Sequence, residues 1–369
     1  MEHLKIIISG GGTGGHIFPA ISIANEIRRK YLQAEILFIG AENRMEMQRV
    51  PAAGYKIVGL PVAGFERKKI WKNIGVLLKL NKSIRIARET VKKFQPHIVI
   101  GVGGYASGPT LKAANQLKIP TLLQEQNSYP GVTNKLLAAK ASKICVAYEN
   151  MDVFFPKEKI ALTGNPIRQD LECSEAKKKE GYAYFNLHPD KKTILILGGS
   201  LGARTINRSI VRFLSQINQE KDIQFLWQSG KYYYAECADE MEKYSDLPIH
   251  LTEFIAKMDL AYSIADLVIS RSGAGSISEF SVLGKATMLV PSPNVAEDHQ
   301  TKNAMALVKK EAAVLVQDKD AEENLISESL HLVRNEEKLK TLRKNILTMA
   351  LPDSAEKIVN EIEKILRIQ

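Results

Sequence analysis

Cysteine is scarce in this chain, which has only three in 369 residues. Cys145, Cys173 and Cys237 lie far apart, and none belongs to a C-x-x-C pair. This spacing excludes a disulfide framework and a zinc site built from thiolates. Histidine, cysteine and aspartate show no metal-ligand spacing either, so we expect no protein-bound metal and no other cofactor. A reducing compartment fits this composition best.

Long uninterrupted apolar runs are also missing. The first apolar run reaches Gly10 too early to form the core of a secretory signal. The uncharged stretches 6–25 and 94–111 are broken by glycine and proline, which a lipid-exposed helix accommodates poorly. The pattern predicts a cytosolic protein without a membrane span. With 45% hydrophobic and 25% charged residues, the chain is typical of a globular protein of about two domains.

Acidic residues are scarce in the first half of the chain only. Residues 1–164 contain 24 lysines and arginines against 11 acidic residues, a net charge of +13. The remaining residues contain 27 against 30, a net charge of −3. The excess positive charge therefore belongs to the first half. It predicts an anionic partner there, whether nucleic acid, a membrane surface or a phosphorylated substrate.

Short β-branched runs alternate with helical periodicity along both halves. Strands separated by helices pair in parallel, which predicts an α/β fold of two related domains with doubly wound sheets. The turn-rich residues 162–166 place the boundary between a domain 1–164 and a domain 165–349. We expect strands at residues 5–9, 35–39, 97–102, 121–124 and 143–147, and again at 193–197, 223–227, 249–254, 267–270 and 287–290.

The first of five motifs is the glycine run 10–15, which lies between an expected strand and an expected helix. Such a loop lets backbone amides approach an oxyanion at a helix N-terminus, although a tight turn with close helix packing would need the same glycines. Pro19 suits the first turn of the helix. The apolar face of that helix is formed by Ala20, Ile23, Ala24, Ile27 and Tyr31.

His16 closes this glycine run. At the start of a helix the dipole opposes protonation, so the ring should remain neutral near pH 7 and could accept a proton. The plainer alternative is a histidine that only hydrogen-bonds its own turn.

The second motif, residues 198–203, again runs from a strand into backbone amides, here with the Ser200 hydroxyl and then Asn207. It suits a diphosphate or an ordinary turn equally well. The third motif, 270–279, places small residues before Glu279. Glu279 could bind a ribose diol through two acceptor oxygens, or it could close a capping box with Ser276.

The remaining two motifs are polar and basic. Residues 297–304 carry donors and acceptors that suit sugar hydroxyls, while Asp298 could equally be a plain N-cap. Residues 67–85 interleave basic and apolar side chains at near-helical spacing, which suits an anionic lipid interface. The alternative is a helix packed on its own sheet with a solvated basic face. A nucleic-acid patch is disfavoured because aromatic residues are sparse there.

Eight short motifs follow one another along the chain: GGTGGH at 11–16, GGY at 103–105, QEQN at 124–127, TNK at 133–135, GNPIR at 164–168, GGSLGA at 198–203, SRSGA at 270–274 and EDHQ at 297–300. They occur in the order found in one family of bacterial glycosyltransferases. By these motifs the chain resembles the UDP-N-acetylglucosamine transferases that act on undecaprenyl-diphospho-muramoyl-pentapeptide, and the resemblance extends over about residues 4–350, nearly the whole chain.

The resemblance implies a GT-B fold, with two Rossmann-like domains, an interdomain cleft and a C-terminal helix near 350–369 that packs back on the first domain. It implies a hexosyltransferase that inverts the anomeric centre without a metal. N-acetylglucosamine would pass from its UDP donor to the 4-hydroxyl of N-acetylmuramic acid in the undecaprenyl-linked acceptor, lipid I. The product would be lipid II, the precursor for peptidoglycan synthesis.

The resemblance also implies a donor site, mainly in the second domain. Ile255 would contact uracil through its backbone, Glu279 would bind the ribose and Gln300 would contact the sugar hydroxyls. The other donor contacts implied are Arg168, Ser200, Ala274, Gly275 and Ser276, with Thr13, Gly14 and Asn127 from the first domain.

The first domain would hold the acceptor. Its glycine loops would cradle the lipid-linked diphosphate. His16 would take the proton of the attacking hydroxyl, with Glu125 as the second candidate for this base. The residues implied to bind the acceptor are Gly14, Gly15, Gly104, Tyr105, Asn127 and Asn134.

The basic stretch falls where this family docks on the membrane. The resemblance therefore implies a peripheral protein at the cytoplasmic face of the bacterial cell membrane, with an anionic lipid surface as a partner and no nucleic acid. Proteins of cell-wall synthesis or division are further candidate partners. The membrane-docking residues implied are Lys68, Lys69, Trp71, Lys72, Ile74, Leu77 and Leu78.

Two other functions compete with this one. A different GT-B enzyme, such as a glycosyltransferase with a soluble acceptor or a UDP-sugar epimerase, would share the fold but would not need a basic patch facing a membrane. A catalytically idle protein that binds nucleotide sugars or scaffolds a membrane assembly would bind the donor without turnover.

Overall fold

The computed structural model describes residues 3–62, 73–168 and 171–368, and the chain divides into two compact units. Unit 1 comprises residues 1–167 and 351–369, and unit 2 comprises residues 168–350. The chain thus leaves unit 1 just after the turn-rich residues 162–166 and returns to it for the last helix.

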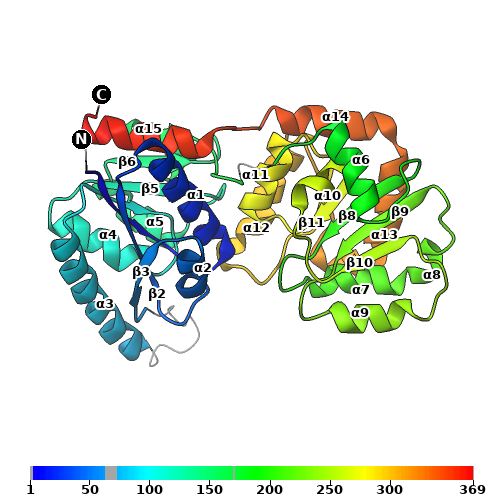
Figure 1. The fold of residues 1–369 in the computed structure, drawn as a ribbon, viewed down its shortest axis with the longest axis horizontal. Coiled ribbons are helices and arrows are strands. Elements are labelled where there is room, and N and C mark those ends of the chain that lie inside the picture. The colour runs from blue at the N-terminus through cyan, green and yellow to red at the C-terminus, as the bar shows by residue number, and fades with distance from the viewer. Residues whose placement is uncertain (1–2, 63–72, 169–170, 369) are drawn as a thin grey trace. The chain divides into compact units, whose positions relative to one another are not determined.

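Unit 1 is built on a seven-stranded sheet in which every neighbouring pair is parallel (Figure 1). The spatial order is β3-β2-β1-β4-β5-β6-β7. Most strands are buried apolar runs, as expected for a parallel sheet that helices cover on both faces. Their bounds are β1 (Lys5–Ser9), β2 (Glu35–Ala41), β3 (Lys56–Leu60), β4 (Ile98–Gly101), β5 (Thr121–Glu125), β6 (Lys143–Val146) and β7 (Ile160–Leu162).

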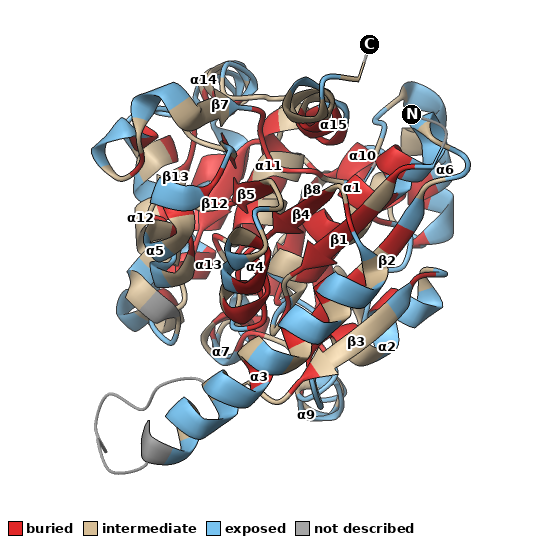
Figure 2. Ribbon diagram, turned by 90° about the vertical axis from the view of Figure 1, so that its left-hand side faces the viewer, coloured by how far each residue is buried: buried red, intermediate tan, exposed pale blue. Residues whose placement is uncertain are grey.

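Helices cover both faces of this sheet, and Figure 2 shows the buried strands and the exposed outer side of α3. Alternate residues of β1 point to opposite faces: Ile6 and Ile8 join a cluster with α1 and α15, whereas Ile7 joins one with α3 and α4. The helices of unit 1 are α1 (Gly14–Lys30), α2 (Glu46–Ala52), α3 (Asn73–Phe94), α4 (Ser107–Gln116), α5 (Val132–Leu137) and α15 (Ser354–Leu366), with short 3-10 turns η2 (Ala138–Lys140), η3 (Met151–Val153) and η4 (Lys157–Lys159).

The last helix completes the core of unit 1. Helix α15 lies beside α1 (Figure 1), and its buried Ile358, Val359 and Ile362 enter the same cluster as Ile6 and Ile8. The hydroxyl of Tyr31 and the ammonium of Lys30 both contact Glu363 Oε1 at 2.6 Å. Apolar burial and a charged hydrogen-bond pair therefore hold the chain terminus on unit 1.

Unit 2 contains a six-stranded parallel sheet in the order β10-β9-β8-β11-β12-β13. Its strands are β8 (Lys192–Leu197), β9 (Ile223–Gln228), β10 (Ile249–Thr252), β11 (Leu267–Ser270), β12 (Thr287–Leu289) and β13 (Val314–Leu315). Its helices are α6 (Glu175–Tyr184), α7 (Arg204–Arg212), α8 (Leu214–Ile217), α9 (Tyr234–Met241), α10 (Met258–Ile264), α11 (Ala274–Val282), α12 (His299–Val308), α13 (Asp318–Arg334) and α14 (Glu336–Leu347), with the short turn η5 (Ala296–Asp298).

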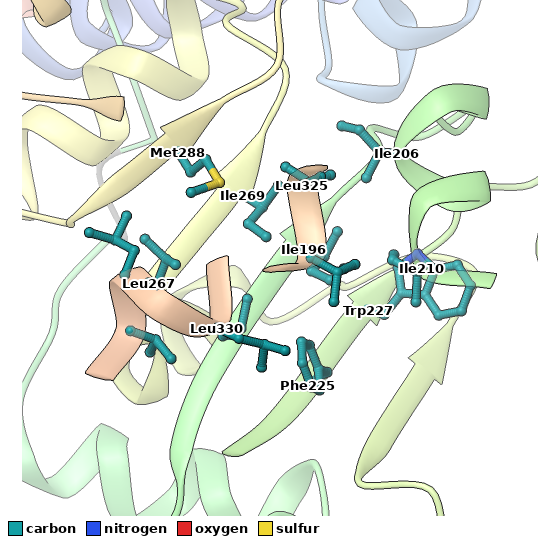
Figure 3. Close-up of a cluster of buried hydrophobic side chains, with 14 of the residues drawn as sticks. Ile196, Ile206, Ile210, Phe225, Trp227, Leu267, Ile269, Met288, Leu325 and Leu330 are labelled. Atoms are coloured by element: carbon teal, nitrogen blue, oxygen red, sulfur yellow. The ribbon is translucent and has the colours of Figure 1, made fainter. Parts of the chain in front are cut away.

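One face of this sheet packs against α7 and α13, as Figure 3 shows. Ile196, Phe225 and Trp227 from the strands meet Ile210 of α7 and Leu325 of α13, and all are essentially fully buried. The indole Nε1 of Trp227 donates to Asn207 Oδ1 at 3.0 Å, so the largest core side chain also has its polar atom satisfied.

Both sheets reverse their winding once. In unit 1 the chain moves from β1 outward to β2 and β3, then returns to the other side of β1 with β4. In unit 2 the same reversal occurs between β8 and β11. Ligands of open α/β sheets bind where the loops after two such strands separate. The fold therefore points to residues 10–13 and 102–106 in unit 1, and to 198–203 and 271–273 in unit 2.

The predicted alternation of strands and helices is confirmed, with three strands missed. The sequence pattern did not predict β3, β7 and β13. Their residues other than Leu60 are only partly buried or exposed, so they give a weak apolar signal. The placement of Pro19 was wrong by a turn: α1 begins at Gly14, so the proline lies inside the helix. No helix in the described part of the chain combines the length and apolar character needed to cross a bilayer.

Candidate active site

The two loops at the reversal point of unit 1 pack directly against each other. A Cβ at Gly104 would lie 2.3 Å from the carbonyl oxygen of Gly11, and one at Gly10 would lie 2.2 Å from a methyl group of Val102. Gly104 also has a φ of +82°. Any side chain at these glycines would push the loops apart, so close packing accounts for them.

His16 lies in the first turn of α1 and hydrogen-bonds back to the loop. Its Nδ1 is 3.1 Å from the carbonyl oxygen of Gly11 and 3.2 Å from Oγ1 of Thr13. Because a carbonyl oxygen only accepts, the Gly11 contact assigns the proton to Nδ1 and makes Nε2 the basic nitrogen. The ring lies against Gly103, where a Cβ would be 2.9 Å from Nε2. The contact with its own turn therefore orients the ring.

The glycine run does not offer all of its amides to a ligand. The amide of Gly12 donates to both carboxylate oxygens of Glu46, at 3.1 and 3.0 Å, and the amide of Ala41 donates to Oε1 at 2.9 Å. The expectation that this loop cradles a diphosphate is therefore corrected at Gly12, because a buried carboxylate of the chain already occupies that amide. The amides of Thr13, Gly14 and Gly15, around the start of α1, remain the part of the loop suited to an anion. Nothing in the sequence pattern singled out Glu46.

Glu125 ends β5 and is 2% exposed. Its Oε1 accepts from the amide and the side chain of Asn127, at 3.0 and 3.2 Å, and its Oε2 accepts from the amide of Gly131 and the side chain of Asn134, at 3.1 and 2.8 Å. Burial raises the pKa of Glu125, while these four hydrogen bonds act in the opposite direction. Both oxygens are thus committed to holding the loop 126–131, which argues against Glu125 as the base.

A buried polar network supports this loop. The side chain of Gln124 donates to Asn165 Oδ1 at 2.9 Å, and Asn165 donates back to the carbonyl of Gln126 at 3.0 Å. Gln126 in turn donates to the carbonyl of Val102 at 2.9 Å. Satisfied buried networks rigidify their surroundings, so the ends of β4 and β5 are fixed relative to each other. Tyr105, by contrast, is 55% exposed beside these loops.

In unit 2 the loop 198–203 follows β8 and is shaped by glycine. Gly199 and Gly202 have φ values of +78° and +94°, and a Cβ at Gly202 would lie 2.4 Å from the carbonyl oxygen of Ser229. The carbonyl of Ser200 accepts from the amide of Lys231 at 3.2 Å, and the Ser200 residue is exposed. The loop thus presents Ser200 at the reversal point of the sheet.

Helix α11 starts at the neighbouring loop. Its N-cap is Gly273, with Ala274, Gly275 and Ser276 in the first turn. Apart from the adjacent residues and the helix's own backbone, no atom of the described residues lies within 4 Å of a Cβ placed at Gly273 or Gly275. Because the helix begins two residues before Ser276, Ser276 is not its N-cap and the capping box is not formed. The start of the helix is therefore open enough for an anion to approach.

The Glu279 side chain does not close a capping box and contacts a polar and a charged side chain. Tyr262, which is 1% exposed on α10, donates from its hydroxyl to Glu279 Oε2 at 2.7 Å. The Oε1 atom lies 3.8 Å from Nε of Arg168. The structure thus brings Arg168 beside Glu279 in the second turn of α11. Tyr262 was missed because its partner is 17 residues away on another helix.

Two of the residues predicted to contact the donor already use one hydrogen-bonding group within the chain. The amide of Ile255 donates to Gln228 Oε1 at 2.8 Å, and Gln300 Oε1 accepts from the amide of Ser292 at 2.9 Å. A uracil could therefore meet Ile255 through its carbonyl, and a sugar hydroxyl could meet Gln300 through its Nε2. Asp298 lies at the N-cap of α12 without capping its backbone, and it accepts from Thr301 Oγ1 at 2.7 Å.

The predicted membrane-docking stretch lies largely outside the described residues, because Lys68, Lys69, Trp71 and Lys72 are not described. Ile74 falls within α3, but its side chain is not described. Leu77 and Leu78, on the first turns of α3, are 50% and 67% exposed. Within the described ranges, no group of three histidine, cysteine or acidic side chains is arranged to hold a metal ion.

Comparison with protein families matches both units to one family. Residues 6–146 match the glycosyltransferase family 28 N-terminal domain, and residues 193–358 match the glycosyltransferase family 28 C-terminal domain. The curated relatives of Parabacteroides distasonis and Cytophaga hutchinsonii are both named UDP-N-acetylglucosamine--N-acetylmuramyl-(pentapeptide) pyrophosphoryl-undecaprenol N-acetylglucosamine transferase. The first is 60% identical over 99% of both chains, and the second is 52% identical over 98% of this chain and 97% of its own.

Solved structures are similar over the same length. The crystal structure of Acinetobacter baumannii MurG has a TM-score of 0.78 and 27% identity, covering 98% of this chain and 99% of its own. A putative UDP-N-acetylglucosamine 2-epimerase from Listeria monocytogenes has a TM-score of 0.70 at 14% identity, covering 100% and 98%, and at that identity the likeness shows the fold alone. These comparisons confirm the predicted fold class of two parallel-sheet α/β domains.

Proposed function

Because the chain belongs to glycosyltransferase family 28, we propose that it transfers N-acetylglucosamine from UDP-N-acetylglucosamine to undecaprenyl-diphospho-N-acetylmuramoyl-pentapeptide, the lipid I acceptor, to form lipid II. The relatives that cover 99% of the chain carry this activity in their names. The structural observation that supports binding of the UDP donor lies in unit 2. There the loop 198–203, the open start of α11 and the Arg168–Glu279 pair gather at the reversal point of the sheet.

Unit 2 is the donor site in this proposal. The amides of Ala274, Gly275 and Ser276 at the start of α11, together with Ser200 and the guanidinium of Arg168, bind the diphosphate of UDP. Glu279 accepts hydrogen bonds from the ribose diol, and the carbonyl of Ile255 accepts from N3–H of uracil. Gln300 donates from Nε2 to a hydroxyl of the sugar. The contacts from Thr13, Gly14 and Asn127 belong to the same proposal.

Unit 1 binds the acceptor. Its net positive charge attracts the lipid-linked diphosphate, and Gly14 and Gly15 offer helix-terminal amides to that anion. Gly104, Tyr105, Asn127 and Asn134 line the same region. Leu77 and Leu78 would enter the lipid surface in which the acceptor is anchored, together with the basic residues that precede α3. The protein would thus act peripherally at the cytoplasmic face of the membrane, with proteins of cell-wall synthesis as further candidate partners.

The reaction is a displacement at the anomeric carbon. The 4-hydroxyl oxygen of N-acetylmuramic acid attacks that carbon as the bond to the UDP oxygen breaks, and attack from the opposite face inverts the configuration. His16 takes the hydroxyl proton on Nε2. The departing negative charge is stabilised by Arg168 and by the α11 amides, so that no step needs a metal ion.

The experiment is a transfer assay with labelled UDP-N-acetylglucosamine and a lipid I analogue, with and without excess EDTA. We expect β-linked product at the same rate in both arms. A strict loss of activity in EDTA that magnesium restores would overturn metal independence. Formation of UDP-N-acetylmannosamine without transfer would instead identify an epimerase, and donor binding without turnover would identify a binding protein.

A further inference from the structure

A buried carboxylate lies directly behind the glycine loop that carries His16. Glu46 is the first residue of α2 and is 1% exposed. In the described part of the chain, the groups that face its carboxylate are the amides of Ala41 and Gly12, and no lysine, arginine or histidine forms an ion pair with it. A buried charge without a cation is retained only where hydrogen bonds compensate for its lost hydration. The charge therefore acts on these two amides.

The loop is shaped to admit this carboxylate. A Cβ at Gly11 would lie 2.0 Å from Glu46 Oε1, and a Cβ at Gly40 would lie 2.6 Å from Glu46 Cγ. Gly11 has a φ of +148°, which a residue with a side chain rarely adopts. Two glycines, one after β1 and one in β2, are thus required for Glu46 to lie where it does.

Glu46 and His16 hydrogen-bond to opposite sides of the same peptide unit. The N–H of Gly12 and the C=O of Gly11 belong to one planar peptide, in which they point in opposite directions. The N–H donates to Glu46 at 3.0 and 3.1 Å, and the C=O accepts from Nδ1 of His16 at 3.1 Å. A carboxylate, a peptide and an imidazole are therefore joined in series by hydrogen bonds.

We propose that Glu46 is a positioning residue for His16 and acts through the Gly11–Gly12 peptide. This inference rests on the proposed function, in which His16 is the general base. The carboxylate fixes the peptide plane and polarises it, so that the Gly11 carbonyl becomes a stronger acceptor. The stronger acceptor holds the proton on Nδ1, which keeps Nε2 basic. It also stabilises the imidazolium that forms when Nε2 takes the proton of the acceptor hydroxyl, while the UDP oxygen leaves with the electrons of the broken glycosidic bond.

The first test reads the imidazole itself and does not need activity. Long-range ¹H–¹⁵N NMR of the full chain would report the tautomer and titration midpoint of His16, assigned with the His16→Ala variant. The groups that face the ring include the Gly11 carbonyl, Thr13 Oγ1 and the backbone of Gly103. We expect Glu46→Gln to mix the tautomers and to lower the midpoint by about half a pH unit or more, because a negative charge is lost. An unchanged tautomer and midpoint would overturn the inference.

The matched control is Glu26→Gln. Glu26 is also a buried carboxylate of unit 1, but it pairs with Arg29 at 2.6 Å on the far turns of α1. We expect this variant to leave the spectrum of His16 unchanged. A His16 shift of the same size in Glu26→Gln would overturn the inference, because general destabilisation would then explain both.

The second test separates positioning from a structural role by kinetics. Glu46→Gln should lower kcat about tenfold at an unchanged KM for the donor, and should move the acid limb of the kcat profile to lower pH. Glu46→Asp keeps the charge, so the limb should stay near its wild-type position; this variant also serves if Glu46→Gln fails to fold. A lower kcat with an unmoved limb would overturn the inference. If wild-type protein transfers no sugar to lipid I, the proposed function fails, while the NMR arm still decides whether Glu46 controls His16.

Discussion

The hydroxyl of Tyr262 donates a 2.7 Å hydrogen bond to one carboxylate oxygen of Glu279. Burial, together with the charge of Glu279, raises the pKa of Tyr262 well above its ordinary value, so the hydroxyl stays protonated and keeps donating. This bond fixes the rotation of the carboxylate and directs the other oxygen toward Arg168. A side chain that no motif contains thus sets the orientation of the proposed ribose-binding group.

Removing the Tyr262 hydroxyl should weaken donor binding without slowing the chemistry. One lost hydrogen bond to a charged group corresponds to about 1.5 kcal/mol, so Tyr262→Phe should raise the donor KM about tenfold at a nearly constant kcat. Glu279→Ala should raise it further. Initial rates over a range of UDP-N-acetylglucosamine concentrations measure this, with Tyr182→Phe, another buried tyrosine of unit 2, as the control. A pure fall in kcat would contradict the assignment.

Removing the proposed base should have the opposite kinetic signature. General base catalysis contributes about 10²- to 10⁴-fold, so His16→Ala should lower kcat by at least about a hundredfold and change the donor KM little. Single-turnover transfer to lipid I and calorimetric titration with UDP-N-acetylglucosamine separate the two effects. Full turnover by His16→Ala would remove His16 from the role of base and leave the fold and substrates unaffected.

The contact of Glu363 with Lys30 and Tyr31 should make the stability of unit 1 depend on pH. Burial raises the pKa of Glu363, but the hydrogen bonds from Lys30 and Tyr31 outweigh it and hold the pKa below its ordinary value of 4.5. A carboxyl group with a lowered pKa in the folded state contributes stability above pH 4.5 and loses it as the pH falls through the folded-state pKa.

Replacing this carboxylate tests the contribution directly. Glu363→Gln should lower the free energy of unfolding by about 1–2 kcal/mol at pH 7, and the difference from wild type should shrink toward pH 3.5. Denaturant unfolding at several pH values measures it. The control Lys364→Gln removes an exposed lysine that pairs with Glu361 on the same helix, and a change above about 0.5 kcal/mol is not expected there. A pH-independent difference for Glu363→Gln would be inconsistent with the linkage.

Exposed leucines on α3 should contribute to binding at a lipid surface. Burying a leucine side chain contributes about 1.5–3 kcal/mol, so Leu77→Glu with Leu78→Glu should weaken binding to phosphatidylglycerol vesicles more than tenfold. Vesicle sedimentation measures the partition. Leu347→Glu alters a leucine of unit 2 that is likewise 50% exposed, and it should bind as wild type does. Equal binding by all three proteins would exclude this face of α3.

Local patterns were sufficient to predict the sheet architecture. Buried runs such as Lys5–Ser9 and Leu267–Ser270 were predicted at their observed bounds, because a parallel strand covered on both faces leaves a continuous apolar signal. The strand Lys56–Leu60 left no such signal, since it lies at the sheet edge, contains a glycine and is mostly only partly buried. Edge strands need little apolar sequence, and this makes them hard to predict.

Candidate site residues could be predicted only where they belong to one short segment of the sequence. The glycine loops, His16 and Glu279 became candidate site residues because each belongs to a short motif that is visible in the sequence. Glu46 and Tyr262 act across 34 and 17 residues, and no spacing rule connects them to Gly12 and Glu279. Likewise, the sequence did not show that Gln228 would occupy the amide of Ile255.

Since residues 351–369 complete the core of unit 1, the whole of unit 2 is an insertion within unit 1. Residues 1–167 emerge from the ribosome long before Ile358, Val359 and Ile362 are synthesised. During translation unit 2 can therefore reach its final form first, while the part of the unit 1 sheet face that α15 covers beside α1 stays exposed. Nascent chains stalled before residue 351 should be bound by chaperones through that face.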